Sequence, residues 1–172
     1  MTVEEVLQKI DHSDRIGVEV LLSRALKATK EQLFAHPERE LREGELDLFL
    51  KEVEQLRAGE PLAYIIGEKE FYGLAFEVNE HVLIPRPETE LMVDKVREFV
   101  GDGSAKILDV GTGSGAIAVA VAHSLPQVEV VATDVSADAL EVAKRNAKRY
   151  GVQKRVEFVE SDLLEEIDEP FD

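Results

Sequence analysis

Residues 105–134 constrain the fold of this chain more strongly than any other stretch. They read AKILDVGTGSGAIAVAVAHSLPQVEVVATD, which predicts a strand, a glycine-rich turn, a helix and a second strand that ends in an acidic residue. A helix with Ser136 as N-cap and Gly151 past its end follows, and then the strand RVEFVE. Strand–helix alternation of this kind predicts an α/β fold with a parallel, doubly wound sheet.

The turn DVGTGSGA, residues 109–116, is the candidate ligand site of this fold. It follows a strand and opens a helix, so its backbone N–H groups and the helix dipole face whatever lies above the strand end. Gly111 and Gly113 would let a ligand approach the backbone. Gly115 would permit close contact between helix and strand.

Two phosphate-binding interpretations of the turn can be weighed directly. A Walker loop ends in Gly-Lys-Ser/Thr, whereas Ala116 follows Gly115 here, which excludes that class. The dinucleotide fingerprint in its tolerant form, G-x-G-x-x-A, is satisfied by Gly111, Gly113 and Ala116. Asp134 would then hold a ribose, so an NAD-dependent oxidoreductase stays open as an alternative.

The turn also matches D-x-G-x-G-x-G, a pattern of S-adenosylmethionine-binding turns, at every fixed position. Asp109 discriminates between the two cofactors, because a carboxylate there suits the ammonium group of the methionine part and would repel a pyrophosphate. Asp134 would accept hydrogen bonds from the ribose hydroxyls, and Asp162 would accept one from the adenine amino group. These three acids favour S-adenosylmethionine over a dinucleotide.

Composition excludes several other classes of function. The chain has no cysteine, so disulfides and thiolate chemistry are absent, and its four histidines (12, 36, 81 and 123) show no metal-ligand spacing. A net charge of −16 disfavours direct binding to nucleic acid. No segment approaches 18 uninterrupted apolar residues, so we expect no membrane span. Without the pattern of a signal peptide at its N-terminus, the protein is expected in the cytoplasm.

Residues 1–58 predict a small helical bundle, because apolar residues recur three and four positions apart. Thr2 with Glu5, and Thr29 with Gln32, are spaced as capping boxes. A separate helical module on an enzyme often docks a partner or substrate, and we expect that role here. The predicted apolar stripes are Val3, Val6, Leu7 and Ile10; Val18, Leu21, Leu22, Ala25 and Leu26; and Leu46, Phe49, Leu50, Val53 and Leu56.

Residues 59–86 predict a linker and a β-hairpin, with turn residues at 72–73 and at 79–80. The first position of a helix tolerates proline, so we expect Pro87 to begin the next helix and the third domain, residues 87–172. The expected apolar face of that helix consists of Met92, Val93, Val96, Phe99 and Val100.

The stretch GEKEFYGLAFEVNEHVLIPRPETE, followed by ILDVGTGSGAIAVA, resembles the PrmC/HemK family of protein-(glutamine-N5) methyltransferases, which modify peptide chain release factors. The resemblance covers essentially the whole chain, and IPRPETE is its more specific signature. It implies a helical N-terminal domain, a hairpin linker and the first part of a Rossmann-like class I methyltransferase domain that uses S-adenosylmethionine.

The resemblance also implies a reaction and its site. A methyl group passes to the side-chain amide nitrogen of the glutamine in the Gly-Gly-Gln motif of a class 1 release factor. By position, the cofactor site would comprise Asp109, Gly111, Thr112, Gly113, Ser114, Gly115, Asp134, Asp162 and Leu163, the last two near the adenine. The entrance for cofactor and substrate would comprise Pro85, Arg86, Pro87, Glu88 and Thr89.

The family positions the amide with an Asn-Pro-Pro-Tyr motif after the fourth strand, and these 172 residues contain no such motif. We therefore expect an N-terminal portion of a longer protein, monomeric and without glutamine methyltransferase activity, and we assign no catalytic residue. The strand KILDV would then form an open sheet edge. A methyltransferase of this fold acting on another protein or on nucleic acid, and a non-enzymatic binding module, stay open as alternatives.

Overall fold

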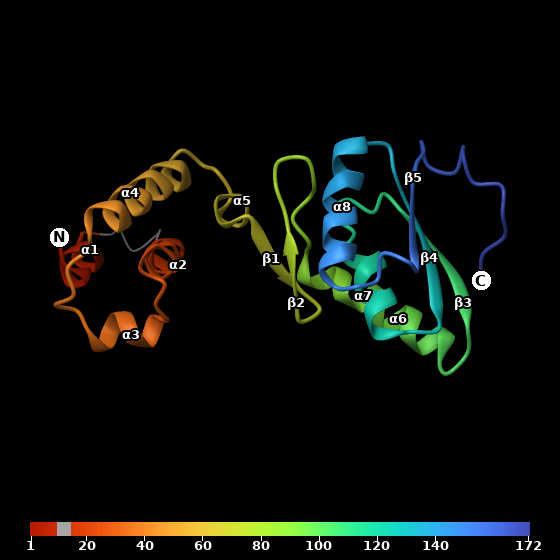
Figure 1. The fold of residues 1–172 in the computed structure, drawn as a ribbon, viewed down its shortest axis with the longest axis horizontal. Coiled ribbons are helices and arrows are strands. Elements are labelled where there is room, and N and C mark those ends of the chain that lie inside the picture. The colour runs from red at the N-terminus through yellow and green to blue at the C-terminus, as the bar shows by residue number, and fades with distance from the viewer. Residues whose placement is uncertain (10–14) are drawn as a thin grey trace. The chain divides into compact units, whose positions relative to one another are not determined.

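The computed structural model describes residues 1–9 and 15–172, so the predicted apolar position Ile10 and His12 lie outside the described residues. It divides into two compact units, Met1–Ile66 and Gly67–Asp172 (Figure 1). The domain boundaries expected after residues 58 and 86 stay predictions.

The first unit is helical, as the spacing of its apolar residues predicts. Both predicted capping boxes are present. The side chains of Thr2 and Thr29 each accept a hydrogen bond from the backbone N–H three residues later, and the side chains of Glu5 and Gln32 accept from the backbone N–H of Thr2 and Thr29. A short helix that the sequence pattern did not predict follows Pro61. The helices are α1 (Val3–Gln8), α2 (Arg15–Leu26), α3 (Lys30–Ala35), α4 (Glu43–Arg57) and α5 (Leu62–Ile66).

An ion pair joins three of these helices inside the helical unit. The guanidinium of Arg24 in α2 binds the carboxylate of Glu52 in α4 and donates a hydrogen bond to the Ile65 carbonyl in α5 at 3.0 Å. The Glu52 side chain is only 5% exposed, and burial raises the pKa of its carboxyl. Most residues of the predicted stripes form the apolar core, which includes Val3, Val6, Val18, Leu21, Leu22, Phe49 and Val53. The prediction that Leu50 belongs to this core is wrong, because its side chain is 49% exposed and lies one residue off the stripe of Leu46, Phe49 and Val53.

The second unit begins with the predicted hairpin, β1 (Glu68–Phe71) and β2 (Leu74–Glu77). Tyr72 and Gly73 form its turn, and both have positive φ, 53° and 71°, as a tight two-residue hairpin turn requires. The Tyr72 N–H donates to the Glu90 carboxylate at 2.9 Å, and its hydroxyl donates to Asp94 at 2.8 Å. These bonds fasten the turn to helix α6.

Helix α6 (Glu90–Val100) follows a single 3₁₀ turn, η1 (Pro87–Thr89), so the α-helix begins three residues later than predicted. Val93 is fully buried, and Val96 and Val100 pack against the same core. The prediction that Met92 and Phe99 share this face is wrong, because their side chains are 56% and 71% exposed. They lie one residue, about 100°, off the stripe that Val93, Val96 and Val100 form at positions i, i+3 and i+7.

The predicted parallel sheet is present, with strand order β3-β4-β5. Its elements are β3 (Ala105–Val110), α7 (Ala116–Ser124), β4 (Val128–Asp134), α8 (Ala137–Arg149) and β5 (Val156–Glu160). Figure 1 shows α6, α7 and α8 on one side of the sheet. Alternate β4 residues, Val128, Val130 and Ala132, pack into the core beneath these helices.

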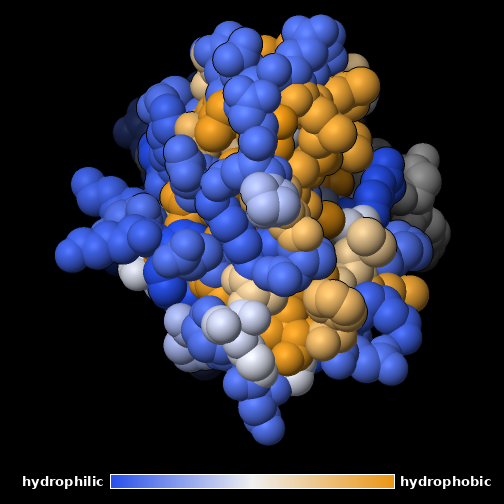
Figure 2. Space-filling view, turned by 90° about the vertical axis from the view of Figure 1, so that its right-hand side faces the viewer, coloured by the Kyte–Doolittle hydropathy of each residue, from blue (hydrophilic) through white to orange (hydrophobic). Residues whose placement is uncertain are grey.

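The outer edge of β3 is not wholly open, contrary to the sequence expectation. The Asp172 N–H donates to the Lys106 carbonyl at 3.1 Å, and the Lys106 N–H donates to the Asp172 carboxylate at 2.9 Å. Figure 2 views the molecule from the side of this last segment and shows apolar atoms gathered among hydrophilic ones. Among the exposed large apolar side chains are Val110 at the end of β3 and Leu163 and Leu164 in the segment after β5.

Candidate functional site

The three glycines of the turn between β3 and α7 all have positive φ, from 54° to 77°. A Cβ atom added to Gly111 or Gly113 would meet no atom within 4 Å, so both face open space. A Cβ atom on Gly115 would lie 3.0 Å from the Cβ of Ala143 in α8. The close contact predicted for Gly115 is therefore made with helix α8 and not with a strand.

Hydrogen bonds within the protein occupy the backbone donors of the turn. The N–H groups of Gly111 and Thr112 both donate to the Thr133 carbonyl, at 2.9 and 2.8 Å. The Gly113 N–H donates to the Asp134 carboxylate at 2.8 Å. A phosphate held at a glycine turn needs such donors for itself. With these three N–H groups already bound to protein oxygens, the turn is poorly arranged to cradle a pyrophosphate.

Two carboxylates flank the turn, as the sequence predicts. Asp109, at the end of β3, accepts a hydrogen bond from the Thr112 hydroxyl at 2.7 Å. Burial raises the pKa of Asp109, and the nearby charge of Asp134 adds a smaller effect in the same direction. Asp134 uses its second oxygen to accept from the Ser136 N–H at 3.0 Å. A site with this charge attracts a cationic ligand and disfavours a phosphorylated one.

One cavity brings the turn together with the entrance segment predicted from the sequence. The cavity is lined by residues of the hairpin, of the entrance segment, of the glycine turn and of the start of α7. They are Phe71, Leu83, Ile84, Pro85, Arg86, Thr89, Asp109, Gly111, Thr112, Gly113, Ser114, Ala116 and Ile117. The lining does not include Pro87 and Glu88, which lie exposed in η1. A largely apolar hollow with a few carboxylate and hydroxyl groups at one wall is typical of a small-molecule site.

The remaining predicted cofactor residues, Gly115, Asp134, Asp162 and Leu163, do not line this cavity. Asp134 ends β4 and reaches the turn through Gly113. Asp162 and Leu163 follow β5 and are exposed, and Leu163 has a positive φ of 52°. The Ser161 N–H donates to the Asp134 carbonyl at 3.1 Å. Asp162 and Leu163, which follow Ser161, therefore leave the sheet at the same end as Asp134.

Asn146 in α8 is a residue of the site region that sequence reasoning missed. It is fully buried, and its side-chain amide donates to the carbonyls of Ser114 and Glu77 at 2.9 and 3.0 Å. Its side-chain oxygen accepts from the Glu77 N–H at 2.8 Å. A signal was available, because Asn146 lies three residues after Ala143 and seven after Ala139, on the stripe of α8 that faces the core.

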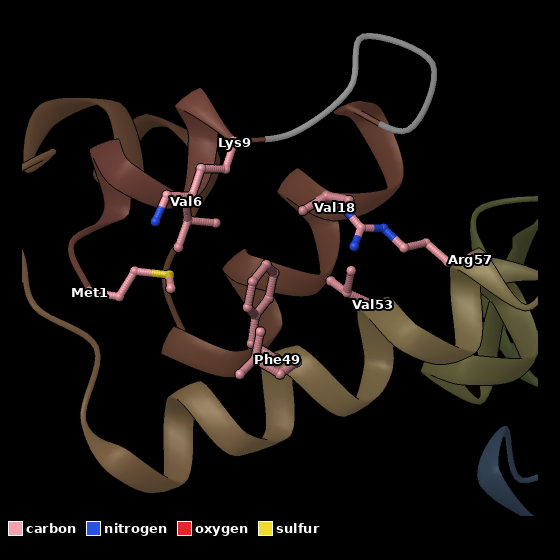
Figure 3. A pocket seen from close by; sticks show the side chains of 8 residues that line it. Met1, Val6, Lys9, Val18, Phe49, Val53 and Arg57 are labelled. Carbon is pink, nitrogen blue, oxygen red and sulfur yellow. The ribbon is translucent and has the colours of Figure 1, made fainter.

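The helical unit carries a groove of its own (Figure 3). Apolar side chains of α1, α2 and α4 line it, among them Val6, Val18 and Phe49. Figure 3 shows Lys9 and Arg57 among its lining side chains. In the part of the chain that the structure describes, no helix is long and apolar enough to span a membrane.

Both units match known protein families. Residues 2–67 match the family described as PrmC N-terminal domain, and residues 87–172 match the family described as Methyltransferase small domain. A release factor glutamine methyltransferase of Chlorobaculum tepidum is 47% identical over 163 residues, covering 91% of this chain and 55% of that protein. A bifunctional methyltransferase of Rickettsia bellii is 34% identical, covering 96% of this chain and 35% of that protein.

The chain thus spans about half the length of the first of these curated relatives and about a third of the second. Among solved structures, a SAM-dependent methyltransferase from Agrobacterium tumefaciens superposes with a TM-score of 0.50 at 20% identity. The match covers 58% of this chain and 33% of that one. At this level of identity the likeness concerns the fold alone.

Proposed function

The chain belongs to the PrmC family of methyltransferases, and we propose that it binds S-adenosylmethionine for the methylation of peptide chain release factors. The proposed acceptor is the side-chain amide nitrogen of the glutamine in the Gly-Gly-Gln motif of class 1 release factors. S-adenosylmethionine supplies an electrophilic methyl group for such a transfer.

The observation that carries the cofactor proposal is the chemistry of the turn. Its carboxylates, Asp109 and Asp134, stand where a ligand with an ammonium and a sulfonium group gains from negative charge. Its N–H groups at residues 111–113 are bound to protein oxygens, which weighs against the NAD-dependent alternative. Gly111 and Gly113 leave open space beside the backbone, as close approach of a cofactor requires.

The release factor as substrate rests on the names of relatives that are 43–47% identical over most of this chain. Within the chain, residues 83–86 and 89 contribute one wall of the cavity beside the turn, which suits an entrance shared by the cofactor and the substrate side chain. A methyltransferase of the same fold acting on nucleic acid is disfavoured by the net charge of −16.

Calorimetric titration with S-adenosylmethionine at pH 8, with NAD in parallel, tests the cofactor proposal. We expect S-adenosylmethionine to bind and Asp109→Asn to weaken its binding about tenfold or more, because the variant removes a partly buried negative charge beside a cation. Asp138→Asn is the matched control, since that carboxylate is 73% exposed on α8. Binding of NAD in place of S-adenosylmethionine would refute the proposal.

Transfer of radioactive methyl groups to a class 1 release factor, with its Gly-Gly-Gln glutamine replaced by alanine as control, tests the substrate. We expect a protein that continues through the Asn-Pro-Pro-Tyr motif to label the release factor that keeps its glutamine and not the alanine variant. We expect the 172 residues alone to label neither release factor. Labelling that persists in the alanine variant would show that another group is the acceptor. Cytoplasmic location and a monomeric state stay predictions, and sedimentation would test the latter.

A further inference from the structure

We infer that Asn146 is a positioning residue. It sets the distance between two walls of the cofactor cavity: the glycine turn, and residues 83–86, which follow the hairpin in sequence. The inference rests on the proposed function, because it concerns the same cavity. Asn146 does not itself line that cavity, so its effect on a ligand would be exerted through the backbone that it holds.

The hydrogen bonds of Asn146 connect two walls that are remote in sequence. On one side the side-chain amide binds the carbonyl of Ser114, a residue that lines the cavity and is itself buried. On the other side it binds both backbone groups of Glu77, the last residue of β2. The chain runs from Glu77 through the buried Val78 to the lining residues at 83–86.

The side-chain amide of Asn146 makes three hydrogen bonds in this arrangement, using both of its donors and accepting one bond at its oxygen. Two donors meet two carbonyls and the side-chain oxygen meets an N–H, at 2.8–3.0 Å, with the residue 0% exposed. A fully buried amide with these partners favours a single geometry, because a shift of either wall weakens a hydrogen bond to a side chain that water does not reach. A small residue at this position would remove the side-chain partner of three backbone groups, of which the Ser114 carbonyl is buried and the two groups of Glu77 are partly buried.

Attachment of the hairpin to α8 does not depend on Asn146. Arg145 pairs with the Glu77 carboxylate at 2.8 Å, and Arg149 pairs with Glu68 at 2.6 Å. The Tyr150 hydroxyl donates to the Ala75 carbonyl at 2.7 Å. What Asn146 adds to these contacts is the connection from the hairpin to the glycine turn. Its loss should therefore disturb the spacing of the walls more than the docking of the hairpin.

The first test compares cofactor affinity with stability. S-adenosylmethionine is titrated into the wild type, Asn146→Ala and the isosteric Asn146→Asp, below their unfolding temperatures. Val152→Ala is the control, because Val152 is buried in the same core just beyond α8 and makes no side-chain hydrogen bond. We expect Kd to rise about tenfold in both Asn146 variants and to stay within twofold in the control at comparable loss of stability.

A second test needs no variant and separates this inference from the proposed function. Amide hydrogen exchange of the wild type is followed with and without S-adenosylmethionine, and we expect the Glu77 N–H to gain protection together with residues 111–115. If the cofactor binds and protects the turn while exchange at Glu77 stays unchanged, the inference is wrong and the proposed function stands. Equal Kd for the Asn146 variants and Val152→Ala would also overturn it. If the wild type does not bind at all, the proposed function fails first.

Discussion

Replacement of Gly115 by alanine should destabilise the methyltransferase unit more than the same change at Gly113, although both glycines share one turn. At either position alanine must adopt a positive φ, 77° or 54°, at a cost of about 1 kcal/mol. Only at 115 does the new Cβ lie 3.0 and 3.2 Å from the Cβ and Cα of Ala143. Overpacking of that kind costs about 2 kcal/mol more.

Gly115→Ala should therefore lose about 3 kcal/mol and Gly113→Ala about 1 kcal/mol, out of the 5–15 kcal/mol typical of a folded protein. For a domain of about 100 residues these losses correspond to falls in Tm of about 12 °C and about 4 °C. Urea and thermal unfolding by circular dichroism measure them. Hydrogen exchange of peptides from Gly67–Asp172 assigns the loss to that unit.

The double variant Gly115→Ala/Ala143→Gly provides the control, because it removes the atom that the new Cβ meets. We expect it to recover part of the loss that Gly115→Ala causes, beyond the sum of the two single changes, despite the cost of about 1 kcal/mol for a glycine within α8. If Gly115→Ala proves no more destabilising than Gly113→Ala, the contact with Ala143 does not restrict the size of the side chain at residue 115, and the reasoning is refuted.

Two further predictions concern carboxyls whose pKa values are raised by burial: Asp109, which is partly buried, and Glu52, which is almost fully buried. An acid with a raised pKa in the folded state favours folding at low pH, and that contribution is lost as pH rises from the unfolded value, about 4, through the folded pKa. Asp109→Asn should therefore flatten the decline in stability of the second unit above pH 4, which urea titrations across pH measure; an unchanged slope would contradict the burial of Asp109. Arg24→Ala should cost about 3 kcal/mol, because it leaves the buried Glu52 carboxylate unpaired, whereas Arg24→Met with Glu52→Met should recover most of it. Equal stability of the single and double variants, by urea unfolding, would refute this account.

Elements that depend on neighbours in sequence were predictable. The capping boxes at Thr2 and Thr29 and the N-cap at Ser136 involve residues only three positions apart, so their pattern alone specifies them. The hairpin turn at residues 72–73 is likewise local. The parallel order of the three strands followed from their alternation with helices.

Features that depend on tertiary contacts were not predictable in the same way. Met92 and Phe99 are as apolar as Val93, and only the position of the core decides which of them is buried. The partner of Gly115 is Ala143, 28 residues away on the neighbouring helix. The helical spacing places Asn146 on the core-facing stripe of α8, but the sequence does not show its partners, which come from β2 and the glycine turn. Such partners are set by packing across elements, which local patterns do not specify.

The attachment of the hairpin to α8 has a consequence for the order of folding. The groups on α8 and just beyond it that hold β1 and β2 lie 68 to 81 residues later in the chain. A two-stranded hairpin alone is only marginally stable in water. During synthesis, the bonds from the hairpin turn to α6 can form first, whereas the attachment of β1 and β2 to α8 must wait for Arg145 to Tyr150. Closure of the longer loop is slower, so we expect the docking of the hairpin on α8 to follow its attachment to α6.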